Sequence, residues 1–255
     1  MTALARLDVD GAIATLTLNR PEQHNALCIE LLDALHERMN EVERLSESRV
    51  LVVTGEGRSF CAGMDLKQVV IERSGDPGLP MRLLSSLGEL TLRLRRLPMV
   101  TVAKINGAAI GGGCGLTCVC DISATHAKAK LGFPEVDLGL CPAVVAPWVV
   151  RKVGGGTARQ ILLSGGLVRP EEARRVGLVN ALLDTPDALD AHVGELVERL
   201  ATGGARALEA TKTLLNELDG SLDEALIRRG AELSASVLST PEAQRILADR
   251  LDASG

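Results

Sequence analysis

The chain has 255 residues, of which 46% are hydrophobic and 24% charged, and its formal net charge is −5. This length can bury a sizeable core, whereas the negative charge and the two Phe, one Trp and no Tyr argue against a nucleic-acid partner. The longest apolar region, residues 99–120, contains Lys104, Asn106 and many glycines, so we expect no membrane span.

The first part of the chain predicts strands that alternate with helices. Residues 4–9 and 13–18 alternate in polarity, and Asp10-Gly11 between them is a hairpin signal. Apolar residues then recur at helical spacing over residues 29–45. Further segments continue this alternation, with strands expected over 50–54 and 100–105 and helices over 64–72 and 81–96. The pattern is that of an α/β fold.

From residue 187 onward the pattern changes to one helix after another. Gly203-Gly204 and Asp219-Gly220 mark breaks, and Pro241 stands near the start of a final helix. We therefore divide the chain into a core over residues 1–195 and a C-terminal helical region over residues 196–255.

Two glycine-rich corners each follow a predicted strand. Residues 110–115 read Ile-Gly-Gly-Gly-Cys-Gly, and residues 60–67 read Phe-Cys-Ala-Gly-Met-Asp-Leu-Lys. Glycine lets the main chain approach a ligand, and the first N–H groups of a following helix have no partner within it. Each corner could supply one N–H group to a single carbonyl oxygen.

Several motifs, in the same order along nearly the whole chain, resemble the enoyl-CoA hydratase/isomerase (crotonase) family. They are Leu18-Asn19-Arg20-Pro21 with Asn25-Ala26-Leu27, residues 55–66, residues 106–113 with Cys120-Asp121, Phe133-Pro134-Glu135 with Leu138-Gly139-Leu140, and residues 165–181. The resemblance implies a spiral of ββα units that holds an acyl-CoA site. It implies that the C-terminal helices cover that site and form a homotrimer or a dimer of trimers. CoA is then part of the substrate, and no separate cofactor is implied.

Glu135 is the candidate proton carrier. It is a lone carboxylate among apolar neighbours, so desolvation would raise its pKa and let it act as acid and base near neutral pH. The residues alone also permit a surface or helix-capping glutamate. The resemblance identifies Glu135 as one of two catalytic glutamates, and implies that Met64 and Gly112 donate their N–H groups to the thioester oxygen.

The second glutamate of the family pattern is missing, because Gly115 stands in its place. Residues 142–147 also lack the acid that isomerase branches carry there. Hydration by Glu135 alone, isomerisation, decarboxylation and acyl-CoA binding without turnover therefore remain open. Residues 142–150 are similar to methylglutaconyl-CoA hydratases, whose carboxylated substrate would need a cation. Candidates are Arg82, Arg93 and Arg96, unless these are solvated arginines of an amphipathic helix.

The resemblance also implies contacts to CoA. They are Ala62, Met64, Asp65, Leu66, Lys67, the Arg20 side chain as a phosphate partner and, from the helical region, Lys212. Asp65 could instead cap the following helix, and Arg20 could pair with Glu22.

Metal chemistry has no support in the residue spacing. The four histidines are scattered, and the six cysteines form no paired C-x-x-C units. We interpret the cysteines as reduced thiols in a cytoplasmic protein, and expect no targeting peptide before the first strand.

Overall fold

A computed structural model describes residues 3–70 and 75–253, and a six-stranded sheet forms its centre. The strand order is β1 (Ala5–Asp10), β2 (Ile13–Leu18), β3 (Val50–Gly55), β5 (Val100–Ile105), β7 (Ile122–His126) and β10 (Ala181–Leu183). The predicted hairpin is confirmed, since β1 pairs antiparallel with β2. The other pairs are parallel. Strand β3 is almost wholly buried, as expected of a strand covered on both faces.

A second, four-stranded sheet lies in the order β4 (Ser59–Cys61), β6 (Ala108–Ile110), β8 (Leu131–Gly132) and β9 (Leu167–Val168). Three successive strand pairs, β3 with β4, β5 with β6 and β7 with β8, each place the first strand in the large sheet and the second in the small one. Helices α2 (Leu66–Val69) and α5 (Gly112–Val119) follow the first two pairs. After the third come the short helix η2 (Val136–Leu138) and helix α6 (Ala146–Ser164). The predicted spiral of ββα units is confirmed.

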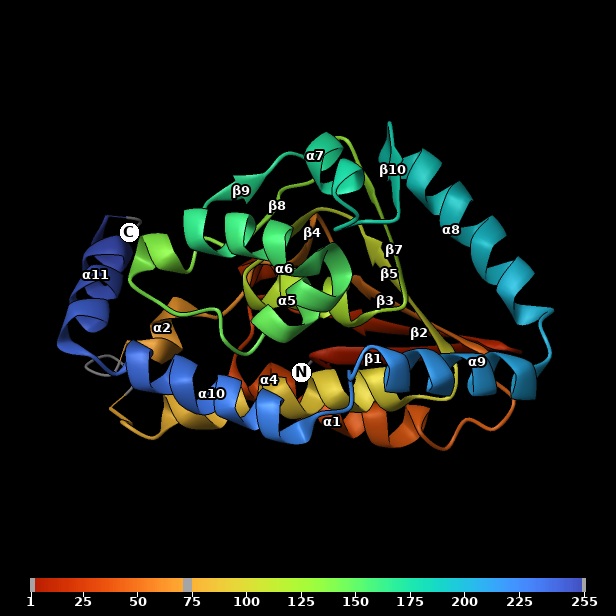
Figure 1. Cartoon of the computed structure of the whole chain (residues 1–255), viewed down its shortest axis with the longest axis horizontal. Helices are drawn as coiled ribbons and strands as arrows, with labels where there is room; N and C mark the ends of the chain where they lie inside the picture. Colours follow the sequence, from red (N-terminus) through yellow and green to blue (C-terminus); the bar gives the residue numbers. More distant parts are fainter. Residues whose placement is uncertain (1–2, 71–74, 254–255) are drawn as a thin grey trace.

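Three helices form one layer of the molecule. Helices α1 (Ile29–Val42), α4 (Leu79–Arg96) and α10 (Glu224–Leu238) lie side by side along one face of the molecule (Figure 1). The helix expected over residues 64–72 is observed as α2, and residues 71 and 72 lie outside the described residues. Because α10 packs on α4, the C-terminal region contributes directly to the core.

Helix α8 (Pro186–Ala201) covers the other face of the large sheet, on the right of Figure 1. Its Leu189, Val193 and Val197 pack against valines of the sheet in a separate apolar cluster. The division expected at residue 195 falls inside this helix. Helices η1 (Pro21–Gln23), α7 (Pro170–Arg175), α9 (Ala205–Leu218) and α11 (Pro241–Asp252) complete the described chain.

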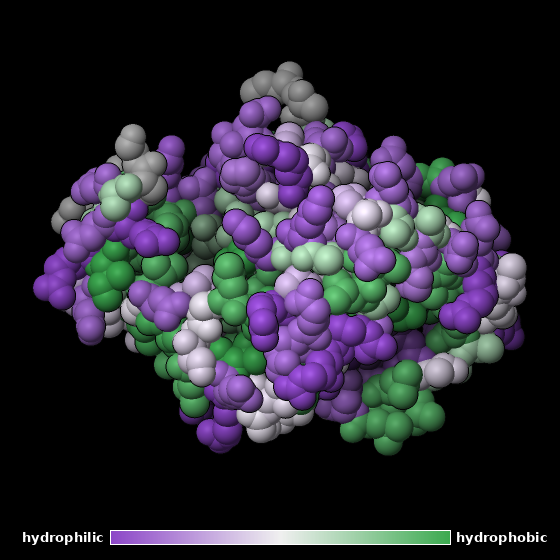
Figure 2. Space-filling model, turned by 90° about the horizontal axis from the view of Figure 1, so that it is seen from above, coloured by the Kyte–Doolittle hydropathy of each residue, from purple (hydrophilic) through white to green (hydrophobic). Residues whose placement is uncertain are grey.

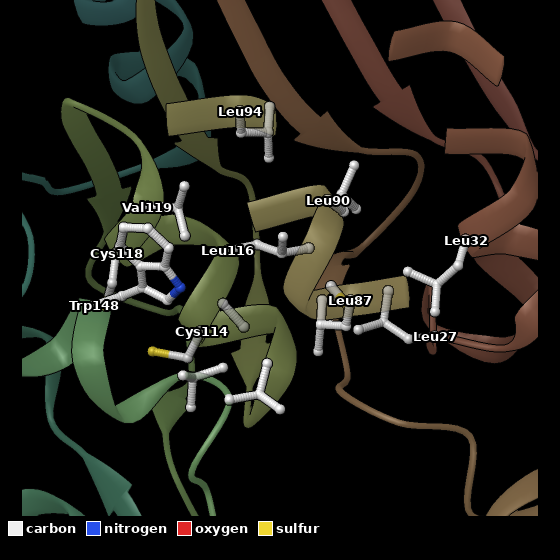
Figure 3. Packing of buried hydrophobic residues seen from close by; sticks show 14 of the residues in the cluster. Leu27, Leu32, Leu87, Leu90, Leu94, Cys114, Leu116, Cys118, Val119 and Trp148 are labelled. Atoms are coloured by element: carbon white, nitrogen blue, oxygen red, sulfur yellow. The ribbon is translucent and has the colours of Figure 1, made fainter. Parts of the chain in front are cut away.

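The core is aliphatic, and helix α5 runs through it with every residue buried. Figure 3 shows Leu27 and Leu87 together on one side of α5, and Trp148 with Cys118 on the other. Trp148, Phe60 and Phe133 are its largest buried side chains. The face in Figure 2 is largely hydrophilic, with separate hydrophobic patches. Among the described residues, no helix is both long enough and apolar enough to span a bilayer.

Candidate active site

The first corner follows strand β4 and is held by residues from both sides. Leu27 donates its N–H to the Gly63 carbonyl over 2.7 Å and accepts from the Asp65 N–H over 2.9 Å. Gly63 has a φ of +87°, where an L side chain is strained. Met64 stands between these two bonds, and its own N–H donates to no backbone group within the described residues. That N–H is free for a ligand.

The second corner joins strand β6 to helix α5. Gly111 has φ +53° and ψ −122°, which turns the chain so that α5 begins at Gly112. As the first helical residue, Gly112 has no carbonyl one turn earlier to receive its N–H. The two corners lie backbone against backbone, because a Cβ on Gly113 would come within 2.2 Å of the Cys61 carbonyl oxygen. A Cβ on Gly63 would likewise come within 2.8 Å of the Ile110 oxygen.

Glu135 follows strand β8 and lies against the second corner. Its Oε1 lies 2.9 Å from the position that a Cβ on Gly111 would occupy. The residue is only 9% exposed, and its buried Oε2 has no hydrogen-bond partner among the described residues. Although Glu135 immediately precedes η2, its side chain makes no capping bond. Burial raises the pKa of this carboxyl to about 7, so it can exchange protons near neutral pH.

Met64, Gly112 and Glu135, predicted from three separate segments, line one pocket. The other lining residues come from α4, from the loop before α6 and from α10. They are Leu84, Leu87, Leu140, Cys141, Pro142, Val144, Val145, Ser234 and Leu238. The cavity has a volume of about 30 Å³. Two N–H groups without a partner among the described residues and one protonatable carboxylate thus face a small apolar space, an arrangement that can polarise a carbonyl and move a proton beside it.

The sequence did not reveal the contribution of α10. Ser234 donates to the Cys141 carbonyl over 2.8 Å and accepts from the Ala143 N–H over 3.0 Å, so it fixes the pocket loop. Its partners lie about ninety residues away in the chain. The only sequence signal for this role is that Ser234 is a small polar residue within the apolar face of α10, and this signal does not show which segment Ser234 contacts.

The residues expected to contact CoA extend outward from the first corner. Ala62, Met64, Asp65 and Leu66 are half-buried, and Lys67 is exposed. Asp65 caps α2 by accepting from the Lys67 N–H over 3.0 Å, which confirms the capping alternative.

Arg20 pairs with Asp65 over 2.8 Å rather than with Glu22, and also donates to the Ala26 carbonyl over 3.0 Å. The Arg20 side chain therefore braces the first corner.

Lys212 lies elsewhere than expected. Its ammonium group is buried, donates to the Met99 carbonyl over 2.9 Å and pairs with Asp121 over 2.8 Å. The expectation that Lys212 approaches CoA is therefore wrong, because this ammonium group is used to anchor α9 to the core.

The arginines considered for a carboxylated acyl chain are also engaged elsewhere. Arg82 pairs with Asp76 over 2.8 Å, Arg93 pairs with Glu43 over 2.8 Å, and Arg96 pairs with Glu224. The described residues lining the pocket include no Lys, Arg or His. The described part of the chain also holds no group of three His, Cys, Asp or Glu side chains suited to a metal ion.

Residues 8–245 match the family model described as enoyl-CoA hydratase/isomerase. The chain belongs to this family. A putative enoyl-CoA hydratase of Thermus thermophilus is 36% identical over 232 residues, which cover 90% of each chain. A short-chain-enoyl-CoA hydratase of Clostridium acetobutylicum is 31% identical over 86% of this chain and 84% of that protein.

Solved structures agree with the family assignment. An enoyl-CoA hydratase/isomerase from Mycobacterium paratuberculosis superimposes with a TM-score of 0.88 at 26% identity, covering 98% of this chain and 99% of that one. This member of the enoyl-CoA hydratase/isomerase family is therefore an enzyme with the crotonase fold.

Proposed function

We propose that this family member hydrates a 2-enoyl-CoA thioester with an uncharged acyl chain. The observation that carries the proposal is the position of Glu135, the one carboxylate that lines the described pocket, beside the Met64 and Gly112 N–H groups. The absence of a cation from the described lining argues against the carboxylated, methylglutaconyl-like substrate considered from the sequence. A branched acyl chain without charge fits the same apolar walls.

In the proposed reaction the thioester oxygen accepts hydrogen bonds from the Met64 and Gly112 N–H groups. Glu135 removes a proton from water, and the resulting hydroxide adds to the β-carbon while the double-bond electrons move to form the enolate. The two N–H groups stabilise the enolate oxygen, a contribution of about 3 kcal/mol for one preorganised donor. Glu135 then returns its proton to the α-carbon. Water is added without any net change in the enzyme, and no cofactor besides the CoA of the substrate is required.

The outer residues would bind the rest of CoA. Lys67 is exposed and has no ion pair among the described residues, so it is available for a phosphate group. Arg20 and Asp65 would act by holding the corner on which Ala62, Met64 and Leu66 are presented. We assign Arg20 and Asp65 this supporting role because their charges already pair with each other.

Isomerisation is the second candidate, and the apolar surroundings of Glu135 favour it. Moving a proton from one carbon to another needs a single acid–base group, whereas hydration also needs room for water. Decarboxylation and non-catalytic binding have no comparable observation in their favour.

The test is to incubate the protein with crotonyl-CoA and with branched and carboxylated 2-enoyl-CoA thioesters, following the conjugated absorbance and the product mass. If the reaction is hydration, the product mass should increase by one water. Glu135→Gln should lower the rate of this reaction by roughly 10²–10⁴-fold. Glu232→Gln is the matched control, since Glu232 is an exposed glutamate of α10 outside the pocket. A shifted double bond without a mass change would instead establish isomerisation. Full activity in Glu135→Gln would refute both proposals.

We also propose a homotrimer or dimer of trimers. Apolar side chains on α6, α9 and α10 are exposed in the single chain, namely Val150, Leu214, Leu215, Leu218, Leu226 and Leu233. Burial of such a surface between subunits would stabilise the assembly. Light scattering after size exclusion should give three or six times the mass of 26.9 kDa. A cytoplasmic location stays a prediction, consistent with six unpaired cysteine thiols.

A further inference from the structure

The space beside Gly115 is filled by one side chain from another element. A Cβ added to Gly115 would lie 2.1 Å from Cγ1 and 2.7 Å from Cβ of Val145. Val145 is only 2% exposed and lines the pocket. The glycine and the valine are therefore complementary, and the valine occupies the volume that any side chain at position 115 would need.

Val145 is fixed where it stands. It immediately precedes α6, donates its N–H to the Pro142 carbonyl over 3.2 Å and accepts from the Val149 N–H over 3.1 Å. A β-branched side chain also has few rotamers available to it. Unlike a long flexible residue, Val145 cannot easily swing aside for a ligand.

The position of Val145 relative to the proposed thioester determines its effect. Gly112 and Gly115 are three residues apart on α5 and so lie on the same face of that helix. A carbonyl bound at the Gly112 N–H begins an acyl chain on the face that Val145 covers at Gly115. The cavity of about 30 Å³ has room for only a few heavy atoms.

We propose that Val145 sets the acyl-chain length by closing the pocket over Gly115, so that this enzyme selects short chains. This inference rests on the proposed acyl-CoA function, and assigns Val145 as its specificity-determining residue. Because an extra methylene in an apolar pocket changes binding by about tenfold or more, removing two methyl groups should admit a chain about two carbons longer.

Acyl-CoA binding tests the inference. The affinities of CoA, butanoyl-CoA, hexanoyl-CoA and decanoyl-CoA would be measured by calorimetry for the wild type, Val145→Ala and Val149→Ala. Val149 is a fully buried valine one helical turn away that does not line the pocket, so Val149→Ala controls for a general loss of packing. Melting temperatures would confirm that each variant is folded.

We expect the wild type to favour butanoyl-CoA over hexanoyl-CoA by about tenfold or more, and Val145→Ala to reduce that preference by about tenfold. Val149→Ala should retain the wild-type preference. If Val145→Ala does not fold, Val145→Ile gives an independent test. It adds one methylene to a side chain that lines the pocket and should weaken binding of butanoyl-CoA about tenfold, while binding of CoA alone stays unchanged.

Equal binding of butanoyl-CoA and hexanoyl-CoA by the wild type would overturn the inference. So would the same chain-length preference in Val145→Ala as in Val149→Ala. Failure of hydration is a separate result. If no enoyl-CoA gains water but Val145→Ala still shifts binding toward hexanoyl-CoA, the proposed reaction is wrong and the role of Val145 is supported.

Discussion

The two corners that supply the proposed N–H donors are held by different forces. The first, at Met64, is half-buried and, besides its backbone bonds to Leu27, depends on side chains, since Arg20 pairs with Asp65 and Asp65 caps α2. The second, at Gly112, lies in the core and depends on close backbone packing that leaves no room for side chains. Loss of a polar contact can be partly replaced by water, whereas a steric clash in the core cannot. The second corner should therefore tolerate substitution far less.

The largest effect is expected from Gly115→Glu, which restores the glutamate of the family pattern. The new side chain would collide with Val145 and bring a second carboxylate near Glu135, so we expect a loss of about 4 kcal/mol in unfolding free energy. Urea denaturation of the wild type and Gly115→Glu measures this loss of unfolding free energy.

The double variant Gly115→Glu with Val145→Gly removes the collision and should recover part of that stability. Equal destabilisation of the single and double variants would show that Val145 is not the obstacle.

Gly113→Ala should cost about 3 kcal/mol, because its Cβ would press the Cys61 carbonyl and force the two corners apart. Gly194→Ala is the matched control, since this α8 glycine has no atom within 4 Å of an added Cβ. The control should be more stable than the wild type by up to about 1 kcal/mol, owing to helix propensity. Thermal and urea unfolding would be compared, and an unaffected Gly113→Ala would contradict the close approach of the corners.

Glu135, which rests against the second corner, should make stability depend on pH. Its folded pKa of about 7 lies above the ordinary glutamate value of 4.5, so the folded state binds the proton more tightly. This contribution is fully present below pH 4.5 and is lost as the pH rises through 7. Between pH 5 and pH 7 the wild type should lose about 2 kcal/mol relative to Glu135→Gln.

Urea unfolding of the wild type and Glu135→Gln at several pH values in this range measures the difference in their unfolding free energies. Titrating groups that both proteins share contribute equally and cancel from this difference. Parallel pH curves would show that Glu135 is not desolvated. If Glu135 acts first as the base, kcat/KM should also fall below pH 7.

The smallest effect belongs to the first corner. Asp65→Ala removes a cap and the partner of Arg20, and should reduce stability by about 1 kcal/mol. Asp223→Ala removes an equivalent cap from α10, where Asp223 accepts from the Leu226 N–H over 3.0 Å. Both should melt earlier, but only Asp65→Ala should weaken acyl-CoA binding by calorimetry. Equal acyl-CoA affinities in the two variants would show that the first corner does not contribute to CoA binding.

The sequence predicted those parts of the site whose signals are local. A run of glycines after one apolar strand and a small-residue turn after another indicated the two corners, and the family resemblance identified Glu135, an isolated acid among apolar residues. Val145, Ser234 and the pairing of Lys212 with Asp121 were not predicted, because each depends on segments that meet only in the folded chain. The missing glutamate at position 115 was visible, but the valine that fills its place was not.

The alternation of strands between two sheets also bears on how the chain reaches this structure. From β3 onward, each parallel neighbour in the large sheet is separated from the next by at least one strand of the small sheet and a helix, and β2 is separated from β3 by α1. Only β1 and β2 can pair by closing a short loop, whereas every later strand must first close a long one. We therefore expect slow, sequential folding that begins at the hairpin and leaves unpaired strand edges exposed while it proceeds.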